Sequence, residues 1–162
     1  MRQPIVHALV AALAAAGLVG CGPSAPALPA PVASAIRLAP APERIPAIND
    51  AAHRHRGPSA SLTTLLVDAD PQVRWGAAYV AALWADDAAD VEALAPYLDQ
   101  GDDATRAMIA GSLAGLGHDG ARQTLTGLKA SREVMPFSDP PLTVGRFATG
   151  ALAEIDRAGV AR

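Results

Sequence analysis

The chain has 162 residues, of which 51% are hydrophobic, 4% aromatic and 18% charged. This balance is too apolar for a wholly disordered protein and too poor in aromatic residues for a β-rich one, so we expect one helical domain. The formal net charge of -3 offers no basic excess to a nucleic-acid backbone, and no nucleic-acid partner is predicted. A single cysteine excludes a disulfide framework, a four-thiolate zinc site and an iron-sulfur cluster held by one chain.

The amino end predicts an export signal. Arg2 precedes a small and apolar run from Ile5 to Val19, which is broken only by His7. The run is about 15 residues long, whereas a transmembrane helix needs about 20 apolar residues. A basic start followed by a short apolar run is typical of a secretory signal, so we predict a signal peptide over residues 1–20.

The end of this run, Leu18-Val19-Gly20-Cys21, resembles the lipobox of bacterial lipoproteins. The resemblance implies that Cys21 is lipidated, that the preceding peptide is removed and that the new amino group is acylated, which anchors the protein in membrane lipid. The residue after the cysteine is Gly22 rather than an aspartate, and this resembles lipoproteins sent to the outer membrane. In a Gram-negative cell the implied location is therefore the periplasmic face of the outer membrane. In other cells it is the outer face of the cell membrane. The alternative is an ordinary cleaved signal with an incidental cysteine.

A proline-rich stretch follows the cysteine. Seven prolines lie between Gly22 and Pro46, interleaved with alanine. Because proline lacks a backbone donor and drives its predecessor toward extended geometry, we predict a flexible linker over residues 21–58. The linker closes with His53-Arg54-His55-Arg56. That segment is either a solvated linker end or a basic patch attracted to lipid phosphates.

From Ser59 onward the apolar spacing predicts paired helices in one domain over residues 59–162. Asp70 followed by Pro71 predicts an N-cap and first turn. An irregular insertion is expected over 132–143. The predicted helices cover residues 61–67 and 70–84, then 90–98 and 103–116, then 121–130 and 144–155.

The second helices of the three pairs are similar to one another, which predicts a repeat architecture. Here the chain resembles the HEAT-repeat family, particularly the phycobilisome lyase HEAT-like repeats. Their second helix reads aspartate, two residues, valine, arginine, two residues and alanine. The match lies in the stretches from Asp70 to Arg74 and from Asp103 to Arg106. The third pair departs from it, because Gly145 takes the place of the arginine.

The resemblance implies an all-α fold, a short α-solenoid of about three HEAT-like helical pairs in an armadillo-type superhelix. In that family the aspartate and arginine bond to neighbouring turns, which implies structural roles for Arg74 and Arg106. The implied function is a non-catalytic adaptor or scaffold that binds another envelope protein through the concave face of the solenoid. The alternative is an accessory subunit or lyase-like enzyme that acts on a cofactor or a partner protein.

Motifs for catalysis are absent from the sequence: it has no Gly-x-Ser-x-Gly, no phosphate loop and no His-Glu-x-x-His. We therefore predict no enzymatic activity, no cofactor and no metal. His118 lies in a glycine-flanked turn and is predicted to cap a helix. The aspartates Asp86, Asp87 and Asp90 lack the spacing of a calcium loop and also fit capping.

The candidate partner-binding residues are Trp75, Tyr79 and Arg146. Helical spacing puts Trp84 on the inward side of its helix, while Trp75 and Tyr79 share the other face, which should line the concave side. Aromatic residues with an arginine at the rim make a protein-binding hot spot. Alternatively, Trp75 and Tyr79 cover the open end of the first repeat by packing against the linker. A groove beside them is predicted from small residues in the later repeats, namely Gly111, Ala114, Gly150 and Ala153.

Overall fold

The computed structural model describes residues 26–160, and this part of the chain is all-helical, as predicted. Its only strand-like pairing is an isolated bridge between Val134 and Thr143. The α-helices are α1 (Ala30–Leu38), α2 (Arg44–Arg54), α3 (Thr63–Leu66), α4 (Pro71–Trp84), α5 (Ala88–Leu94), α6 (Asp103–Gly115), α7 (Asp119–Leu128) and α8 (Val144–Val160). Short 3-10 helices are η1 (Ala41–Glu43), η2 (Ser59–Leu62) and η3 (Ala95–Asp99).

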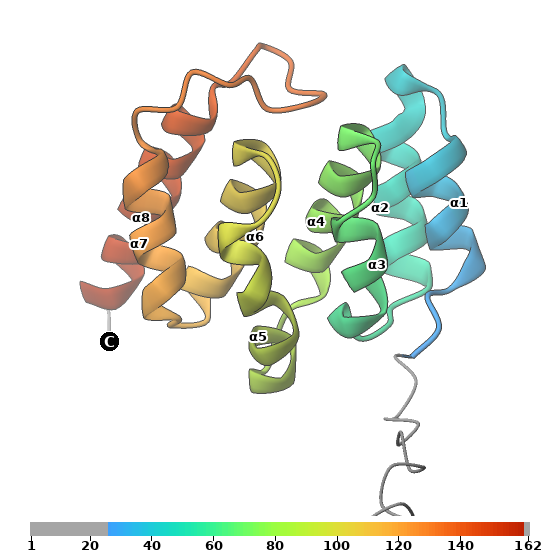
Figure 1. Cartoon of the computed structure of the whole chain (residues 1–162), viewed down its shortest axis with the longest axis horizontal. Helices are drawn as coiled ribbons and strands as arrows, with labels where there is room; N and C mark the ends of the chain where they lie inside the picture. Colours follow the sequence, from blue (N-terminus) through green and yellow to red (C-terminus); the bar gives the residue numbers. More distant parts are fainter. Residues whose placement is uncertain (1–25, 161–162) are drawn as a thin grey trace, which may run out of the picture.

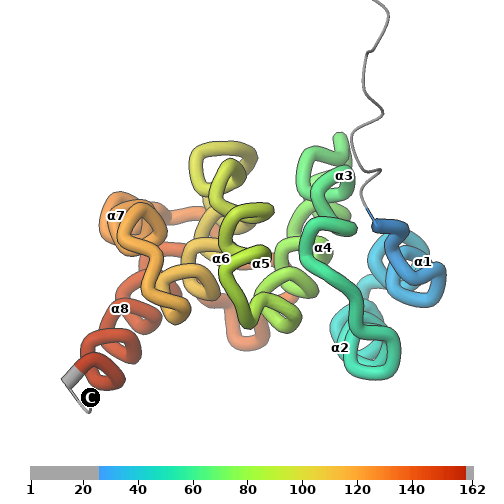
Figure 2. Tube along the Cα trace, turned by 90° about the horizontal axis from the view of Figure 1, so that it is seen from below, coloured from blue at the N-terminus to red at the C-terminus, as the bar shows by residue number. Residues whose placement is uncertain are grey.

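The helices stand side by side in a row that begins with α1 and ends with α8 (Figure 1). Consecutive helices pack as antiparallel neighbours, α1 with α2, α3 with α4 and α7 with α8. The second helices also contact one another in succession, α2 with α4, α4 with α6 and α6 with α8. Seen along the helices, α3 and α7 lie on one side of the row and α2 and α8 on the other (Figure 2).

The predicted starts and ends of the central helices are mostly confirmed. Asp70 caps α4, since its side chain accepts the backbone N–H of Gln72 at 2.8 Å. At the end of α6 the chain turns at Gly117, whose φ of +88° is a conformation that favours glycine. α6 begins at Asp103, as predicted, and its N-cap is Asp102, which accepts the N–H of Thr105 at 2.8 Å.

The prediction of a flexible linker over residues 21–58 is wrong for much of this range, because it contains α1, η1 and α2. Their prolines lie where a helix loses nothing by them. Pro29 is the N-cap of α1 and Pro31 lies in its first turn, while Pro46 lies in the first turn of α2. The first N–H groups of a helix have no partner within that helix, so a missing one there breaks no hydrogen bond.

Apolar side chains at helical spacing then fix α1 and α2 to the rest of the row. Val32, Ile36 and Ile48 are fully buried. A Cβ atom built on Gly76 of α4 would lie 3.3 Å from both isoleucines, so the helices approach closely at that glycine. At the other end of α4, the Trp84 indole N–H donates to the carbonyl of Ala52 at 3.0 Å. The folded unit therefore begins near Pro29 and contains a helical pair ahead of the three that we predicted.

Buried positions recur along the second helices at the predicted alignment. The equivalent sets are Val73, Thr105 and Val144, then Ala77, Ile109 and Ala148, then Ala81, Leu113 and Leu152, all of them buried. The alignment also explains why Gly145 departs from the repeat pattern. A Cβ on Gly145 would lie 2.4 Å from the Lys129 carbonyl oxygen and 2.8 Å from that of Ser131. An arginine cannot occupy this place, because α8 begins directly against the end of α7.

Two glycines of α8 give a matched stability test. We expect Gly145→Ala to destabilise the protein by about 1–3 kcal/mol, the usual cost of overpacking, because rigid backbone carbonyls face its Cβ. Gly150→Ala should stabilise it by about 0.5–1 kcal/mol, since a Cβ there meets nothing within 4 Å and alanine favours the helix. Urea unfolding followed by circular dichroism measures both changes. A Gly145→Ala protein as stable as the wild type would contradict this packing.

Candidate functional site

The structure separates the three predicted partner-binding residues. Trp75 is only 5% exposed, so the expectation that it lines an open face is wrong. Tyr79 is half-buried, stacks on Trp75 with ring centroids 5.3 Å apart, and donates its hydroxyl to Asn49 Oδ1 at 2.9 Å. The aromatic pair thus packs against α2. This agrees with the alternative prediction, in which the pair packs against the residues that precede residue 59.

The irregular 132–143 loop completes the cover over Trp75. Its Phe137 ring meets the Trp75 ring edge-on at a centroid distance of 5.5 Å. The Arg44 guanidinium lies over the Phe137 ring at 5.5 Å, a cation-π contact that joins this loop to α2. Figure 1 shows the loop reaching from the α7–α8 end of the row toward α4. The sequence does not predict this contact, and the only signal for it is the aromatic Phe137 in an insertion that carries three prolines.

Arg146 is exposed in the first turn of α8 and lines a shallow depression with Lys129 and Thr149. It therefore lies apart from the aromatic pair, and α6 stands between α4 and α8 in the row (Figure 1). The three residues do not form one site.

An apolar cavity of about 450 Å³, which we call the α6–α8 groove, lies between these two helices. The predicted small residues Gly111 and Ala114 line it, whereas Gly150 and Ala153 do not. Its remaining lining residues are Gly115, Gly117, Ala151, Glu154, Ile155, Ala158 and Gly159.

Arg74 links two neighbouring helical pairs. Its guanidinium donates from Nη2 and Nε to one carboxylate oxygen of Asp102, at 2.7 and 2.9 Å, and from Nη1 to the carbonyl of Asp68 at 2.9 Å. Arg106 likewise donates to the carbonyl of Leu98 at 2.9 Å and to Asp103 at 3.2 Å. Both arginines bond to neighbouring turns, as the family resemblance implied.

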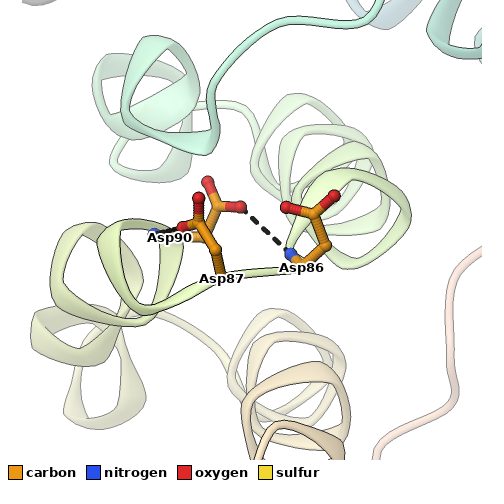
Figure 3. Close-up of side chains that lie close together, drawn as sticks. All are labelled: Asp86, Asp87 and Asp90. Carbon is orange, nitrogen blue, oxygen red and sulfur yellow. Dashed lines mark hydrogen bonds between the residues drawn. The ribbon is translucent and has the colours of Figure 1, made fainter.

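The three aspartates near the start of α5 come together in space, with one carboxylate oxygen of each within 4.8 Å of the others (Figure 3). Asp87 accepts the backbone N–H of Asp90 at 2.9 Å, and Asp90 accepts those of Asp86 and Ser59 at 3.0 and 3.1 Å. Asp86 pairs with Arg56. Asp87 therefore caps α5, as predicted, whereas Asp90 and Asp86 link this turn to Ser59 and Arg56.

His118 caps α7. Its Nδ1 accepts the backbone N–H of Ala121 at 3.1 Å, so the ring nitrogen takes the place of the usual N-cap oxygen. The capping role predicted for His118 is confirmed by this contact.

Hydrogen bonds lower the pKa values of two carboxyl groups that join the helices, those of Asp90 and Asp102. Burial acts to raise the pKa of Asp90, but the N–H groups of Asp86, Ser59 and Asp87 outweigh it and hold this pKa below its ordinary value. For Asp102, burial is again outweighed, by the Thr105 hydrogen bonds and by Arg74, and the pKa is lowered.

These shifts fix the direction of the acid response. A lowered folded-state pKa contributes stability above the unfolded pKa, near 4, and that stability is lost as pH falls through the folded value. We expect Asp90→Asn to cost about 1–3 kcal/mol at pH 7, because one buried N–H loses its acceptor, and to cost progressively less below about pH 4. Urea unfolding between pH 3 and pH 7 measures this, with Asp139→Asn, an exposed carboxylate, as control. A cost for Asp90→Asn that does not shrink in acid would be inconsistent with the hydrogen bonds described.

Comparison of the chain with protein-family models, with curated proteins and with solved structures gave no match. The resemblance to HEAT-like repeats therefore stays a prediction from the motif residues.

Proposed function

We propose that the protein is a lipid-anchored, non-catalytic adaptor of the cell envelope whose helical pairs form a short HEAT-like solenoid that binds another envelope protein. The observation that supports this best is that the candidate polar side chains are hydrogen-bonded to backbone groups within the fold. Asp90 accepts the backbone N–H groups of Ser59 and Asp86, and His118 accepts that of Ala121 at the start of α7. The α6–α8 groove remains as an open apolar surface.

The solenoid part of the proposal is supported by links that join one pair to the next. The Trp84 indole reaches the carbonyl of Ala52, and Arg74 reaches Asp102. The second helices contact each other in order along the row, which is how repeat proteins bury faces that no single pair can bury.

The partner-binding part is supported by the α6–α8 groove. Its volume of about 450 Å³ has room for the apolar side chains of a partner segment. Glycine and alanine line most of it, and Ile155 supplies the largest side chain. Because Trp75 is buried, this groove replaces the aromatic pair as the proposed contact surface.

The anchor part is supported by the sequence alone, because residues 1–25, which include the signal peptide and Cys21, lie outside the described residues. Leu18-Val19-Gly20-Cys21 holds the single cysteine of the chain where the lipobox needs it. Within residues 26–160, no helix is long and apolar enough to cross a bilayer.

The anchor is tested by Cys21→Ala in cells of the source organism. The wild type should incorporate a clickable fatty-acid analogue and sediment with membranes, because several acyl chains anchor a protein stably in a bilayer. Cys21→Ala should take up no label and either leave the membrane fraction or accumulate at the precursor mass. A wild type that stays unlabelled and soluble would exclude the lipoprotein.

Partner binding is tested with a photo-crosslinking amino acid placed at Gly115, which lines the groove. The control position is Gly127, an exposed residue of α7. A Cβ at either position meets nothing within 4 Å, so both substitutions should leave the fold intact. Irradiation of cells should give a discrete adduct from position 115 and none from position 127. Adducts of equal yield at both positions, or none at either, would rule out the α6–α8 groove as the contact surface.

A further inference from the structure

The helical α1 and α2 bring the folded unit much closer to Cys21 than a long linker would. Cys21 precedes Pro29, the N-cap of α1, by eight residues. In any conformation eight residues span at most about 29 Å. If Cys21 is acylated, as proposed above, the start of α1 stays within about 3 nm of the lipid headgroups.

The end of α2 and the end of α4 lie beside this start of α1. A Cβ atom on Gly57 would be 3.5 Å from the Pro29 ring and 3.4 Å from the Trp84 ring. Figure 1 shows the first turn of α1 and the last turn of α2 at the same edge of the row. We call this surface, made by Pro29 and residues 53–57, the exit face.

The exit face carries the basic segment His53-Arg54-His55-Arg56, and all four side chains are exposed. The neighbouring acidic groups belong to α2 and to the turn after α4. Asp50 pairs with Arg54 at 2.5 Å, Asp86 pairs with Arg56, and carboxylate oxygens of Asp87 and Asp90 lie within 4.8 Å of that of Asp86. A guanidinium has five N–H donors, so each arginine retains donors for a phosphate oxygen beside its carboxylate partner.

We propose that the exit face lies against the membrane, with Arg54, Arg56 and the two histidines in contact with the phosphates of lipid headgroups. This proposal depends on the lipid anchor proposed above and specifies the orientation that the anchor imposes. The short connection limits the distance, and the remaining guanidinium N–H groups of the exposed Arg54 and Arg56 are the donors that this face offers to lipid phosphates. The opposite edge of the row, with the 132–143 loop, then points away from the membrane.

The proposal is tested on protein purified from membranes of its own cells. Intact mass first shows whether the chain carries acyl groups. The acylated protein is then placed in vesicles of phosphatidylethanolamine and phosphatidylglycerol, or in detergent, and digested briefly with trypsin. Cleavage after Arg54 and Arg56 should be several-fold slower on vesicles than in detergent, while cleavage after Lys129 and Arg132 should be unchanged.

The two tryptophans provide a second measurement. They lie nine residues apart on α4, which separates them by about 13 Å along the helix axis. Energy transfer to a dansyl-labelled lipid should be stronger from Trp84, measured in Trp75→Phe, than from Trp75, measured in Trp84→Phe. The tryptic comparison uses the wild type and gives a result even if one of these variants does not fold.

A charge-reversal pair tests the phosphate contact. Arg54→Glu should remove much of the protection of the Arg56 site on anionic vesicles, whereas Arg146→Glu, the same change at an exposed position of α8, should not. A chain without acyl groups would overturn both the anchor and this orientation. An acylated chain in which vesicles slow cleavage after Arg54 and after Arg132 to the same extent would overturn the orientation alone. Protection of the Arg56 site that Arg54→Glu leaves intact would overturn the phosphate contact.

Discussion

The arrangement of the helices depends on carboxylates that accept two kinds of donor at once. Asp102 shows this best, because one of its oxygens accepts the N–H of Thr105 at the start of α6 and the other accepts the Arg74 guanidinium of the preceding pair. A helix start leaves N–H groups without partners, and a buried N–H without an acceptor is costly. The residue that caps α6 therefore also sets where α4 stands beside it. Asp90 joins α5 to the start of η2 by the same means, through the N–H of Ser59.

Small side chains are the second constraint on the row. Alanine and glycine recur among the buried residues of α4 and α6, for example Gly76, Ala77 and Ala110. At Gly145, where α8 meets the end of α7, there is no room for a Cβ, and at Gly76 of α4 there is just enough room beside the isoleucines of α1 and α2. Toward the ends of α6 and α8 the same small residues face open space, and the result is the α6–α8 groove. Close packing and an apolar groove thus follow from one composition.

Periodicity in the sequence was sufficient to predict the central helices, because their caps and turns are local. Asp70 before Pro71 predicts the start of α4, and Gly117 predicts the end of α6, from neighbouring residues alone. The same local reasoning failed at α1 and α2, where we took prolines as breakers. Whether a proline breaks a helix depends on its position in the helix. The sequence signal that favoured helices was the spacing of apolar residues such as Ile36 and Ile48, which are fully buried in the structure.

The face of Trp75 could not be predicted from its own helix. An aromatic residue on the second apolar side of a helix faces solvent only if nothing distant in the sequence covers it. Here Phe137, 62 positions later, packs against the Trp75 ring, with Arg44 over the phenyl ring. Tyr79 stacks on Trp75 and is itself bonded to Asn49 of α2. Such a contact depends on the tertiary positions of α7 and α8, from which the 132–143 loop reaches toward α4, and helical spacing within α4 carries no information about it.

The length of the connection to Cys21 has a consequence for the partner as well. On the proposed anchor, the α1 end of the row stays within about 3 nm of the bilayer. Packed helices are about 8–10 Å apart, so the three steps from α2 to α8 place the α6–α8 groove only about 3 nm farther along the row. If the exit face lies on the headgroups, the row runs beside the membrane rather than away from it. A partner in the groove would then be a protein held at that same membrane surface, and a long flexible linker would have imposed no such restriction.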